Sequence, residues 1–569
     1  MKRFLAGAAL ASALAAAALF AQGIASRNVK PQPRGKPSGR PFPAKFTDVA
    51  REAGLTQPVI FGTDTHVRYI FETSQGGVAW LDYDKDGWID AFLVSGTRLN
   101  EDPPEATNRL YRNNRDGTFT DVTEKAGLRR GGWGSGVTVG DYDGDGDDDL
   151  FVTYFGDNAL YRNNGDGTFT DVAPQVGLKQ PGKYWNAGAV LFDLDRDGDL
   201  DLFVSNYVDF DIARVPKPGE NAFCTWKGVA VACGPRGLPA ARMWLYRNDG
   251  GTFVDISERG GVAKARCYGM TATAADFNND GWPDVYVACD SSASLLFVNR
   301  KNGTFSEEGV ERGVALNEDG REQAGMGLGI GDYNLDGYLD IFKTHFADDT
   351  HILYRGSAEG VFEDVTLAAG LGVETRFVGW GAGIVDLDND GWPDLFAATG
   401  QVYPETEKFF DGYPYRSPRL LFRNLGNGRF EQLFEEAGPA IAAAHSSRGA
   451  AFGDYDNDGD VDILIMNRNQ PPSLLRNDLP KGANWVQVRA PLGSRVTAIY
   501  GGRRQTQEVT SQASFYSAND SRLHFGLGGA TAVDLAIRFP DGTMRKAANV
   551  PLNRVFTATR PVERGAAKD

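Results

Sequence analysis

Short apolar runs separated by polar turns dominate the chain, and they recur in one order. Residues 78–81 and 91–94 are apolar runs rich in β-branched and aromatic residues, on either side of an aspartate-rich turn. Residues 110–122 (LYRNNRDGTFTDV) then place two further runs around an Asp-Gly turn, which is typical of a hairpin. Each such unit therefore predicts four short antiparallel strands.

This unit repeats along most of the chain. The hairpin half recurs at 160–178, and degenerate copies follow at 245–262, 296–314, 353–371 and 421–438. A repeated four-stranded antiparallel unit is typical of a β-propeller blade. We therefore predict an all-β protein with a seven-bladed β-propeller over residues 44–480. Short strands with glycine turns predict a small C-terminal β domain over residues 484–560.

The two ends of the repeat region complement each other. The last unit has the strand sequence LLRN at 474–477 without a returning partner, and the missing FTDV strand stands at 46–49. We expect this N-terminal strand to complete the last blade, because that pairing closes the ring and removes an exposed strand edge. Closure of this kind favours seven blades over an open solenoid.

A glycine stands five residues before the aspartate-rich turn in six of the seven units. The set is Gly77, Gly136, Gly188, Gly327, Gly381 and Gly449, with Thr271 as the exception. The innermost strands of a propeller crowd together near its axis, so we expect these positions to lack room for a side chain.

The turn between the first two strands of each unit follows one nine-residue pattern, Asp-x-Asp/Asn-x-Asp-Gly-x-x-Asp. Successive copies start 59, 52, 83, 56, 54 and 68 residues apart. Side-chain oxygens at positions 1, 3, 5 and 9 and the carbonyl at position 7 can converge on one point, and Ca²⁺ takes about six to eight oxygen ligands. Without a cation, carboxylates clustered in this way repel one another.

We therefore predict calcium loops, up to seven Ca²⁺ in all, one per blade. Strands flank these loops and the closing acid is at position 9, which distinguishes them from EF-hands. Ordinary Asp/Gly turns without metal are the alternative. The predicted ligands are Asp82, Asp84, Asp86, Trp88 and Asp90 in loop 1; Asp141, Asp143, Asp145, Asp147 and Asp149 in loop 2; Asp193, Asp195, Asp197, Asp199 and Asp201 in loop 3; Asp276, Asn278, Asp280, Trp282 and Asp284 in loop 4; Asp332, Asn334, Asp336, Tyr338 and Asp340 in loop 5; Asp386, Asp388, Asp390, Trp392 and Asp394 in loop 6; and Asp454, Asp456, Asp458, Asp460 and Asp462 in loop 7.

The sequence pattern at the N-terminus indicates that the protein is exported. Lys2 and Arg3 precede an apolar stretch over 4–20, and small residues at Ala21 and Ala25 offer cleavage points, so residues 1–25 resemble a signal peptide. A retained N-terminal anchor is the alternative, although the run is short for a spanning helix. Residues 26–43 are basic and Pro-rich, which predicts a disordered linker. No other segment is long and apolar enough to cross a membrane.

Four cysteines stand in the middle of the chain. In an oxidising compartment they allow two disulfides with three connectivities, and we favour Cys224 with Cys233 and Cys267 with Cys289. Free buried thiols are the alternative.

The charge balance and the histidines limit the possible functions. A net charge of −16 and a pI near 5.0 argue against nucleic acid as a partner. The histidines show no metal or triad spacing, and the best polar cluster near the axis is His445 to Arg448. We therefore assign no catalytic or cofactor-binding residue. The five histidines are His66, His345, His351, His445 and His524.

Two regions are candidates for ligand contact. Long insertions interrupt the blade period at 95–108, 206–243 and 399–419, and the last is rich in aromatic residues. Large side chains also begin several inner strands, where they either stack on a ligand or pack between blades. These side chains are Trp133, Trp185, Tyr268, Trp380 and Arg448.

The recurring loop and hairpin resemble the FG-GAP/VCBS repeats of integrin-α-type propellers. The segment CTWKGVAVACGPRGLP at 224–239 and the tail from Gly493 further resemble the cartilage acidic protein-like family, which pairs such a propeller with a C-terminal ASPIC/UnbV domain. The tail carries GSRVTAIYGGRRQTQEV, SRLHFGLGGA and VDLAIRFPDGTMRKAANV, but has Phe-Pro-Asp-Gly at 539–542 where the family usually has Trp-Pro-Ser-Gly. The resemblance implies an extracellular, calcium-binding, non-enzymatic protein.

These observations predict a secreted, periplasmic or cell-surface calcium-binding module for binding or adhesion. The expected partner is an extracellular protein or glycan, the calcium is structural, and no integral membrane segment remains after signal cleavage. Two alternatives stay open. One is a calcium-dependent carbohydrate-active enzyme of the lyase or dehydratase type. The other is an assembly partner in a secreted biosynthetic or envelope complex.

Overall fold

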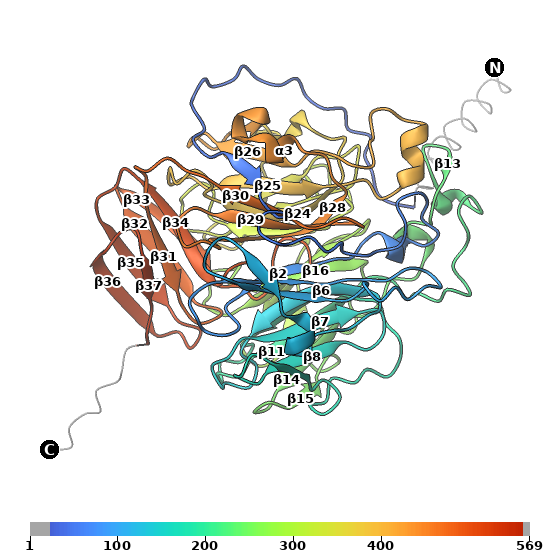
Figure 1. Cartoon of the computed structure of the whole chain (residues 1–569), viewed down its shortest axis with the longest axis horizontal. Helices are drawn as coiled ribbons and strands as arrows, with labels where there is room; N and C mark the ends of the chain where they lie inside the picture. Colours follow the sequence, from blue (N-terminus) through green and yellow to red (C-terminus); the bar gives the residue numbers. More distant parts are fainter. Residues whose placement is uncertain (1–22, 561–569) are drawn as a thin grey trace.

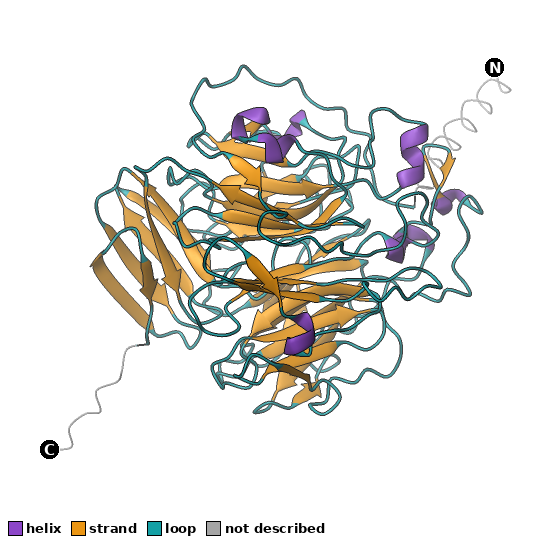
Figure 2. Cartoon of the chain, viewed as in Figure 1, coloured by secondary structure: helices purple, strands orange, loops and turns teal. Residues whose placement is uncertain are grey.

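The computed structural model describes residues 23–560. The predicted signal peptide lies almost entirely outside the described residues. The predicted all-β fold is confirmed: seven four-stranded antiparallel sheets come from the repeat region, and two further sheets form a C-terminal domain (Figures 1 and 2). In the described residues, none of the helices has the length and apolar character that crossing a bilayer requires.

The seven sheets are the blades, and in the first six the strands follow in chain order from the axis outward. Their strands are β2 (Val78–Leu81), β3 (Asp90–Leu93), β4 (Arg109–Asn113) and β5 (Phe119–Asp121) in blade 1; β6 (Gly134–Gly140), β7 (Asp149–Tyr154), β8 (Ala159–Asn163) and β9 (Phe169–Asp171) in blade 2; β10 (Asn186–Phe192), β11 (Asp201–Asn206), β14 (Trp244–Asn248) and β15 (Phe253–Asp255) in blade 3; β16 (Gly269–Ala275), β17 (Asp284–Cys289), β18 (Leu295–Asn299) and β19 (Phe305–Glu307) in blade 4; β20 (Leu328–Gly331), β21 (Asp340–Lys343), β22 (Ile352–Arg355) and β23 (Glu363–Asp364) in blade 5; β24 (Gly379–Val385), β25 (Asp394–Thr399), β26 (Leu420–Asn424) and β27 (Phe430–Leu433) in blade 6; and β28 (Ser447–Gly453), β29 (Asp462–Asn467), β30 (Ser473–Asn477) and the N-terminal β1 (Phe46–Asp48) in blade 7.

Helical turns are short and lie in the connections. They are η1 (Ile70–Glu72), α2 (Thr123–Ala126), η2 (Ala222–Cys224), η3 (Pro235–Gly237), η4 (Leu371–Val373), η5 (Pro404–Lys408), η6 (Glu435–Ala437) and α3 (Pro439–Ala442). A small hairpin of β12 (Thr225–Trp226) and β13 (Val229–Ala230) projects from the second insertion.

The ring closes through the N-terminal strand, as the sequence predicts. β1 pairs antiparallel with β30, with Phe46 opposite Asn477 and Asp48 opposite Leu475. Blade 7 then packs on blade 1 through an apolar cluster in which Trp80 stacks on Tyr455 at a centroid distance of 6.4 Å. The N-terminal strand and the contacts between blades 7 and 1 thus join the first and last units of the ring.

An asparagine at the end of the third strand ties neighbouring blades together. The Asn163 side-chain amide donates to Tyr83 O in blade 1 (2.9 Å) and to Asp148 O in its own blade (3.3 Å). The same pair of bonds recurs in five other blades, while blade 5 carries Gly356 at this position. The other five residues are Asn113, Asn248, Asn299, Asn424 and Asn477.

The C-terminal domain consists of two sheets around its own apolar core. One sheet has the order β34-β31-β37 and the other β33-β32-β35-β36. The strands are β31 (Asn484–Arg489), β32 (Arg495–Tyr500), β33 (Arg503–Glu508), β34 (Arg522–Gly528), β35 (Val533–Arg538), β36 (Met544–Val550) and β37 (Val555–Thr557).

The connection between β33 and β34 enters the centre of the ring. Residues 511–519, here called the plug segment, hydrogen-bond to the innermost strand of every blade. Their partners are Val78, Val137, Ala189, Thr271, Leu328, Ala382 and Phe452, in blade order. The repeat pattern does not predict this insertion. The inserted segment interlocks the propeller with the C-terminal domain.

The plug segment explains why a glycine recurs five residues before the aspartate-rich turns. A Cβ built on Gly136 would lie 2.9 Å from Tyr516 Cβ, and one on Gly449 would lie 2.6 Å from Ser517 Oγ. The exception also contacts the plug, because Thr271 Oγ1 accepts the Tyr516 N–H at 3.3 Å. The predicted crowding at the axis is therefore confirmed, and part of it comes from the C-terminal domain.

The N-terminal segment differs from the expected disordered linker. Residues 26–43 have no regular strand or helix, yet they lie along blades 5 and 6. Arg27 pairs with the buried Asp349 at 2.7 Å, and the Val29 N–H donates to Asp348 O at 2.8 Å. Two of the positive charges that indicated a solvated linker, Arg27 and Arg34, instead pair with acidic groups of the ring.

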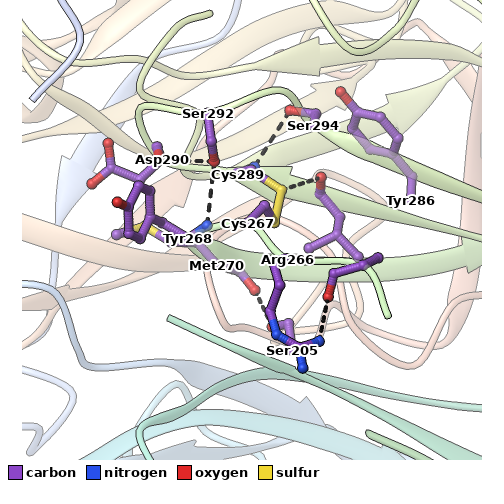
Figure 3. Close-up of a disulfide and its surroundings, with 12 residues drawn as sticks. Ser205, Arg266, Cys267, Tyr268, Met270, Tyr286, Cys289, Asp290, Ser292 and Ser294 are labelled. Atoms are coloured by element: carbon purple, nitrogen blue, oxygen red, sulfur yellow. Dashed lines mark hydrogen bonds between the residues drawn. A yellow bond between two sulfur atoms is a disulfide. The ribbon is translucent and has the colours of Figure 1, made fainter. Parts of the chain in front are cut away.

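The two favoured disulfides are present. Cys224 pairs with Cys233 beside the β12–β13 hairpin, and Cys267 pairs with Cys289. The second bridge links the entry to β16 with the end of β17, beside Tyr268 and Ser294 (Figure 3). All four cysteines are thus bonded.

Candidate metal centre

Each aspartate-rich loop joins the first and second strands of its blade, so all seven lie at the same face of the ring. The backbone turns sharply because the fourth loop residue has positive φ, as at Lys85 (56°) and Asn389 (56°). Position 6 also has positive φ, 87° at Gly87, a conformation that glycine adopts without steric cost.

Hydrogen bonds inside the loop orient its first and fifth carboxylates. In loop 2 one oxygen of Asp141 accepts the Gly146 N–H at 2.8 Å, and Asp145 accepts the Asp147 N–H at 2.9 Å. Equivalent bonds occur in the other loops, as between Gly391 and Asp386 at 2.8 Å. In loops 2 and 6 one oxygen of the first aspartate is thereby held, and the other has no partner and is left for a ligand.

The ninth residue connects the loop to the third strand. Asp149 accepts the Asn163 N–H at 2.7 Å and the Tyr142 N–H at 3.1 Å. Burial raises the pKa of Asp149 to about 8, and it raises the pKa of Asp90 and Asp201 to about the same value. A charged carboxylate at this depth is costly unless a positive charge lies beside it.

In five loops, three carboxylates bring oxygen atoms to within 4.8 Å of one another. Loops 1 and 3 do so with positions 1, 3 and 5, and loops 2, 6 and 7 with positions 1, 3 and 9. Within the seven loops, six residues have a buried carboxylate oxygen without a hydrogen-bond partner: Asp141, Asp193, Asp195, Asp276, Asp386 and Asp456. This donor set fits a hard cation such as Ca²⁺.

Loops 4 and 5 differ from the other five. Asn278 and Asn334 occupy position 3, and their side-chain amides donate to the neighbouring Asp280 (3.1 Å) and Asp336 (2.8 Å). Loops 4 and 5, which the structure describes in full, form no group of three converging carboxylates. Metal binding by all seven loops, the position-7 carbonyls included, stays a prediction.

The large side chains at the inner strands pack instead of lining an open channel mouth. Trp185, Trp380 and Arg448 are fully buried, and Phe515 and Tyr516 of the plug segment lie in the same apolar cluster. The Arg448 guanidinium lies 4.0 Å from the Trp380 ring centroid and donates to Thr73 O at 2.6 Å. The packing alternative therefore holds for these three side chains.

Two of the histidines lie together, because the His345 N–H donates to His351 Nδ1 at 3.1 Å and both side chains are buried. His524 is buried in the C-terminal domain, and His445 bonds to Gln470 at 3.0 Å. The predicted polar cluster from His445 to Arg448 does not converge on one point. Ser447 donates a hydrogen bond to Asn467, whereas the Arg448 guanidinium donates to Thr73 O.

Sequence reasoning missed the contribution of the C-terminal domain to the loop face. Gln487 Nε2 donates to Asp454 at 2.7 Å, the Thr506 N–H donates to Asp332 at 3.0 Å, and Arg538 pairs with Asp276 at 2.7 Å. Each acceptor is the first aspartate of a loop. The signal available in the sequence was Gln487 itself, a polar residue between Val486 and Val488, which the structure buries.

Two family comparisons agree with this architecture. FG-GAP-like repeats match residues 82–152, 141–204, 229–287, 276–343, 332–397 and 413–465, and the pattern named ASPIC and UnbV matches residues 487–565. The chain therefore belongs to the FG-GAP-like repeat proteins and carries a C-terminal ASPIC and UnbV domain.

The chain is homologous to cartilage acidic protein 1. It is 24% identical to the mouse protein over 524 residues, covering 85% of this chain and 74% of that protein. It is 25% identical to the human protein over 337 residues, covering 55% and 47%. Chicken integrin alpha-6 is 29% identical over 149 residues, covering 24% and 14%. This homology and the two disulfides indicate an extracellular, adhesion-type module.

Proposed function

We propose that the chain is a secreted calcium-binding β-propeller that acts as a binding or adhesion module, with structural calcium. The observation that carries the proposal is the set of buried carboxylate oxygens without partners, four of which belong to the first aspartate of a loop. Such an oxygen is expensive to bury alone, and a divalent cation supplies the missing charge.

The loop residues would coordinate the ion, and the bound ion would link neighbouring strands of the blade. Asp141, Asp143 and Asp149 bring their oxygens together in loop 2, and Asp149 also bonds to the backbone of the third strand. Bound Ca²⁺ supplies positive charge and fixes the loop. Each occupied loop would thus secure the first three strands of its blade.

The face opposite the calcium loops supports a binding role. The second-to-third strand connections lead to that face, and the insertions at 206–243 and 399–419 belong to them. Figure 1 shows the β12–β13 hairpin on the side of the ring away from the C-terminal domain. Phe409 in the second of these insertions is 64% exposed. We propose that an extracellular protein or glycan contacts these insertions.

Calcium dependence of thermal stability tests the structural part of the proposal. We expect chelation to lower the melting temperature of the full chain and added Ca²⁺ to restore it, because a site at 100 times its Kd contributes about 2.7 kcal/mol. Mg²⁺ at the same concentration is the control. An unchanged melting temperature, with no Ca²⁺ bound by equilibrium dialysis, would overturn it.

Partner capture tests the binding part. Glycan arrays and pull-downs from extracellular protein fractions are expected to give a ligand whose binding falls when Phe409→Ser is introduced. Val310→Ser, an equally exposed site at 62%, is the matched control. Binding that is equally sensitive to both substitutions would argue against the insertion face.

A further inference from the structure

The C-terminal domain covers the seven loops unequally. The domain covers loop 6 from one side, where the Gly528 N–H donates to Asn389 O at 2.9 Å and Tyr500 Oη donates to Gly391 O at 3.2 Å, while Asp390 at position 5 stays exposed. Asp386, Asp388 and Asp394 are all buried there. Loop 7 is covered by Trp485, which lies against Gly459, and by Gln487 at Asp454.

Loops 1 to 3 instead border an open cleft between ring and domain. The cleft has a volume of about 620 Å³, and its ring side includes Asp82, Asp141 and Asp193, the first ligand of each of these loops. Arg489 and Pro491 lie on its domain side. The remaining carboxylates of these loops include exposed ones, Asp84, Asp143 and Asp197.

The plug segment prevents a simple lifting of the domain. Ser514 and Leu328 exchange two backbone hydrogen bonds of 2.6 Å, and the Phe515 ring packs edge-on against Trp380 at a centroid distance of 4.9 Å. Undocking therefore requires these contacts to break together. Opening of this kind is a cooperative local event with its own free energy.

We propose that the C-terminal domain is a calcium-linked latch that divides the loops into two classes. Ions in loops 6 and 7 lie under the domain, where the first aspartate of each loop is buried, and they exchange slowly until the domain and its plug lift. Ions in loops 1 to 3 exchange through the cleft while the domain stays docked. This proposal rests on the proposed calcium binding.

The linkage works in both directions. Gln487 holds one oxygen of Asp454 and so orients that carboxylate towards a cation, which raises the affinity of loop 7 in the docked state. By reciprocity, an ion in loop 7 stabilises the docked domain by the same free energy. Without the ion, Asp454, Asp456 and Asp462 repel one another beneath the domain.

Release kinetics test the two classes. The full chain, loaded with Ca²⁺, is mixed with an excess of a fluorescent chelator, and we expect a fast and a slow phase. Asp143→Asn in loop 2 is expected to reduce the amplitude of the fast phase only. Asp388→Asn in loop 6 is expected to reduce the amplitude of the slow phase only. A single phase, or the reverse assignment, overturns the proposal.

Weakening the latch tests its mechanism. Trp485→Ala removes the cover of loop 7 and is expected to accelerate the slow phase about tenfold or more, with the fast phase unchanged. Arg545→Ala is the matched control, since Arg545 bonds to Thr559 at 2.9 Å within the domain, away from the loops. Equal slow rates in both variants overturn the latch. If Trp485→Ala does not fold, Gln487→Met replaces it, with the same expected result.

Hydrogen exchange separates the latch from the proposed function. Amides of residues 511–519 are expected to exchange faster in chelator than in Ca²⁺. If the chain binds no Ca²⁺ at all, the proposed function fails together with the latch. If it binds Ca²⁺ but residues 511–519 exchange at the same rate in both conditions, only the latch is overturned.

Discussion

The carbonyl oxygen of Tyr516 occupies the space that a side chain at Gly77 would need. Tyr516 belongs to the C-terminal domain, and Gly77 precedes the innermost strand of blade 1, more than 400 residues earlier in the chain. The same oxygen accepts the Val137 N–H at 3.0 Å in blade 2. One backbone group thus joins the two domains at the axis of the ring.

Replacing this glycine is expected to displace the plug segment. Gly77→Ala places a methyl group on a backbone oxygen that cannot rotate away, so we expect a loss of about 3 kcal/mol or more in the free energy of unfolding. Urea denaturation measures it. Gly412→Ala is the control, because nothing lies within 4 Å of a Cβ at that position. Equal stability of the two variants would show that the plug does not need this space.

The blade-joining asparagines are expected to matter more than their neighbours. Asn163→Ala leaves two buried carbonyls without their donor, which costs about 2–3 kcal/mol. The adjacent Asn164 is exposed and bonds only to threonines of the hairpin turn, Thr168 and Thr170. Asn164→Ala is therefore expected to change the melting temperature little. Similar losses in both variants would contradict the role of Asn163 between blades.

Stability is expected to fall on mild acidification because His351 is buried in its neutral form. Burial lowers the pKa of His351 to about 4, although the Glu374 carboxylate opposes this shift. The unfolded chain gains a proton below its ordinary pKa of about 6.5, and the folded chain does not until about 4. This histidine alone then destabilises the fold by about 2 kcal/mol between pH 7 and pH 5.

His351→Gln is expected to flatten this part of the pH profile of the melting temperature. His66→Gln, at an exposed site, serves as the comparison. His345 lies beside His351, and burial lowers its pKa as well, with Lys343 and Arg27 nearby. The measurement is therefore the difference in slope between the His351→Gln and His66→Gln profiles. A profile with unchanged slope in His351→Gln would assign the acid sensitivity elsewhere.

The predicted leader is expected to end before Gly23. Ile24 and Ala25 are buried, the Ala25 N–H donates to Ser291 Oγ at 2.7 Å, and Gly23 O accepts the Arg236 N–H at 3.1 Å. Removal after Ala25 would lose all three contacts, whereas removal after Ala21 keeps them. Intact mass of the exported chain measures the cleavage point. A mature chain that begins at Ser26 would contradict this expectation.

The strands and the ring closure follow from the sequence, because their signals are local or repeated. Alternating apolar runs, Asp-Gly turns and the unpaired strand at 474–477 are readable within a few residues. The seven aspartate-rich loops can also be identified from the sequence, since the pattern from Asp82 to Asp90 recurs in each unit with its glycine. The sequence left three disulfide connectivities open, and the favoured one is present.

The docking of the C-terminal domain was decided by the tertiary structure alone. Nothing near Ser514 or Tyr516 marks them as residues of the ring axis, since they show no repeat and no strand pattern. The sequence pattern identified Gly136 and Gly449, but it did not identify the plug-segment residues that contact them. Their contacts join segments hundreds of residues apart, and only a closed ring presents the surface into which the plug fits. Local patterns determine strands and turns, whereas this complementarity exists only between folded surfaces.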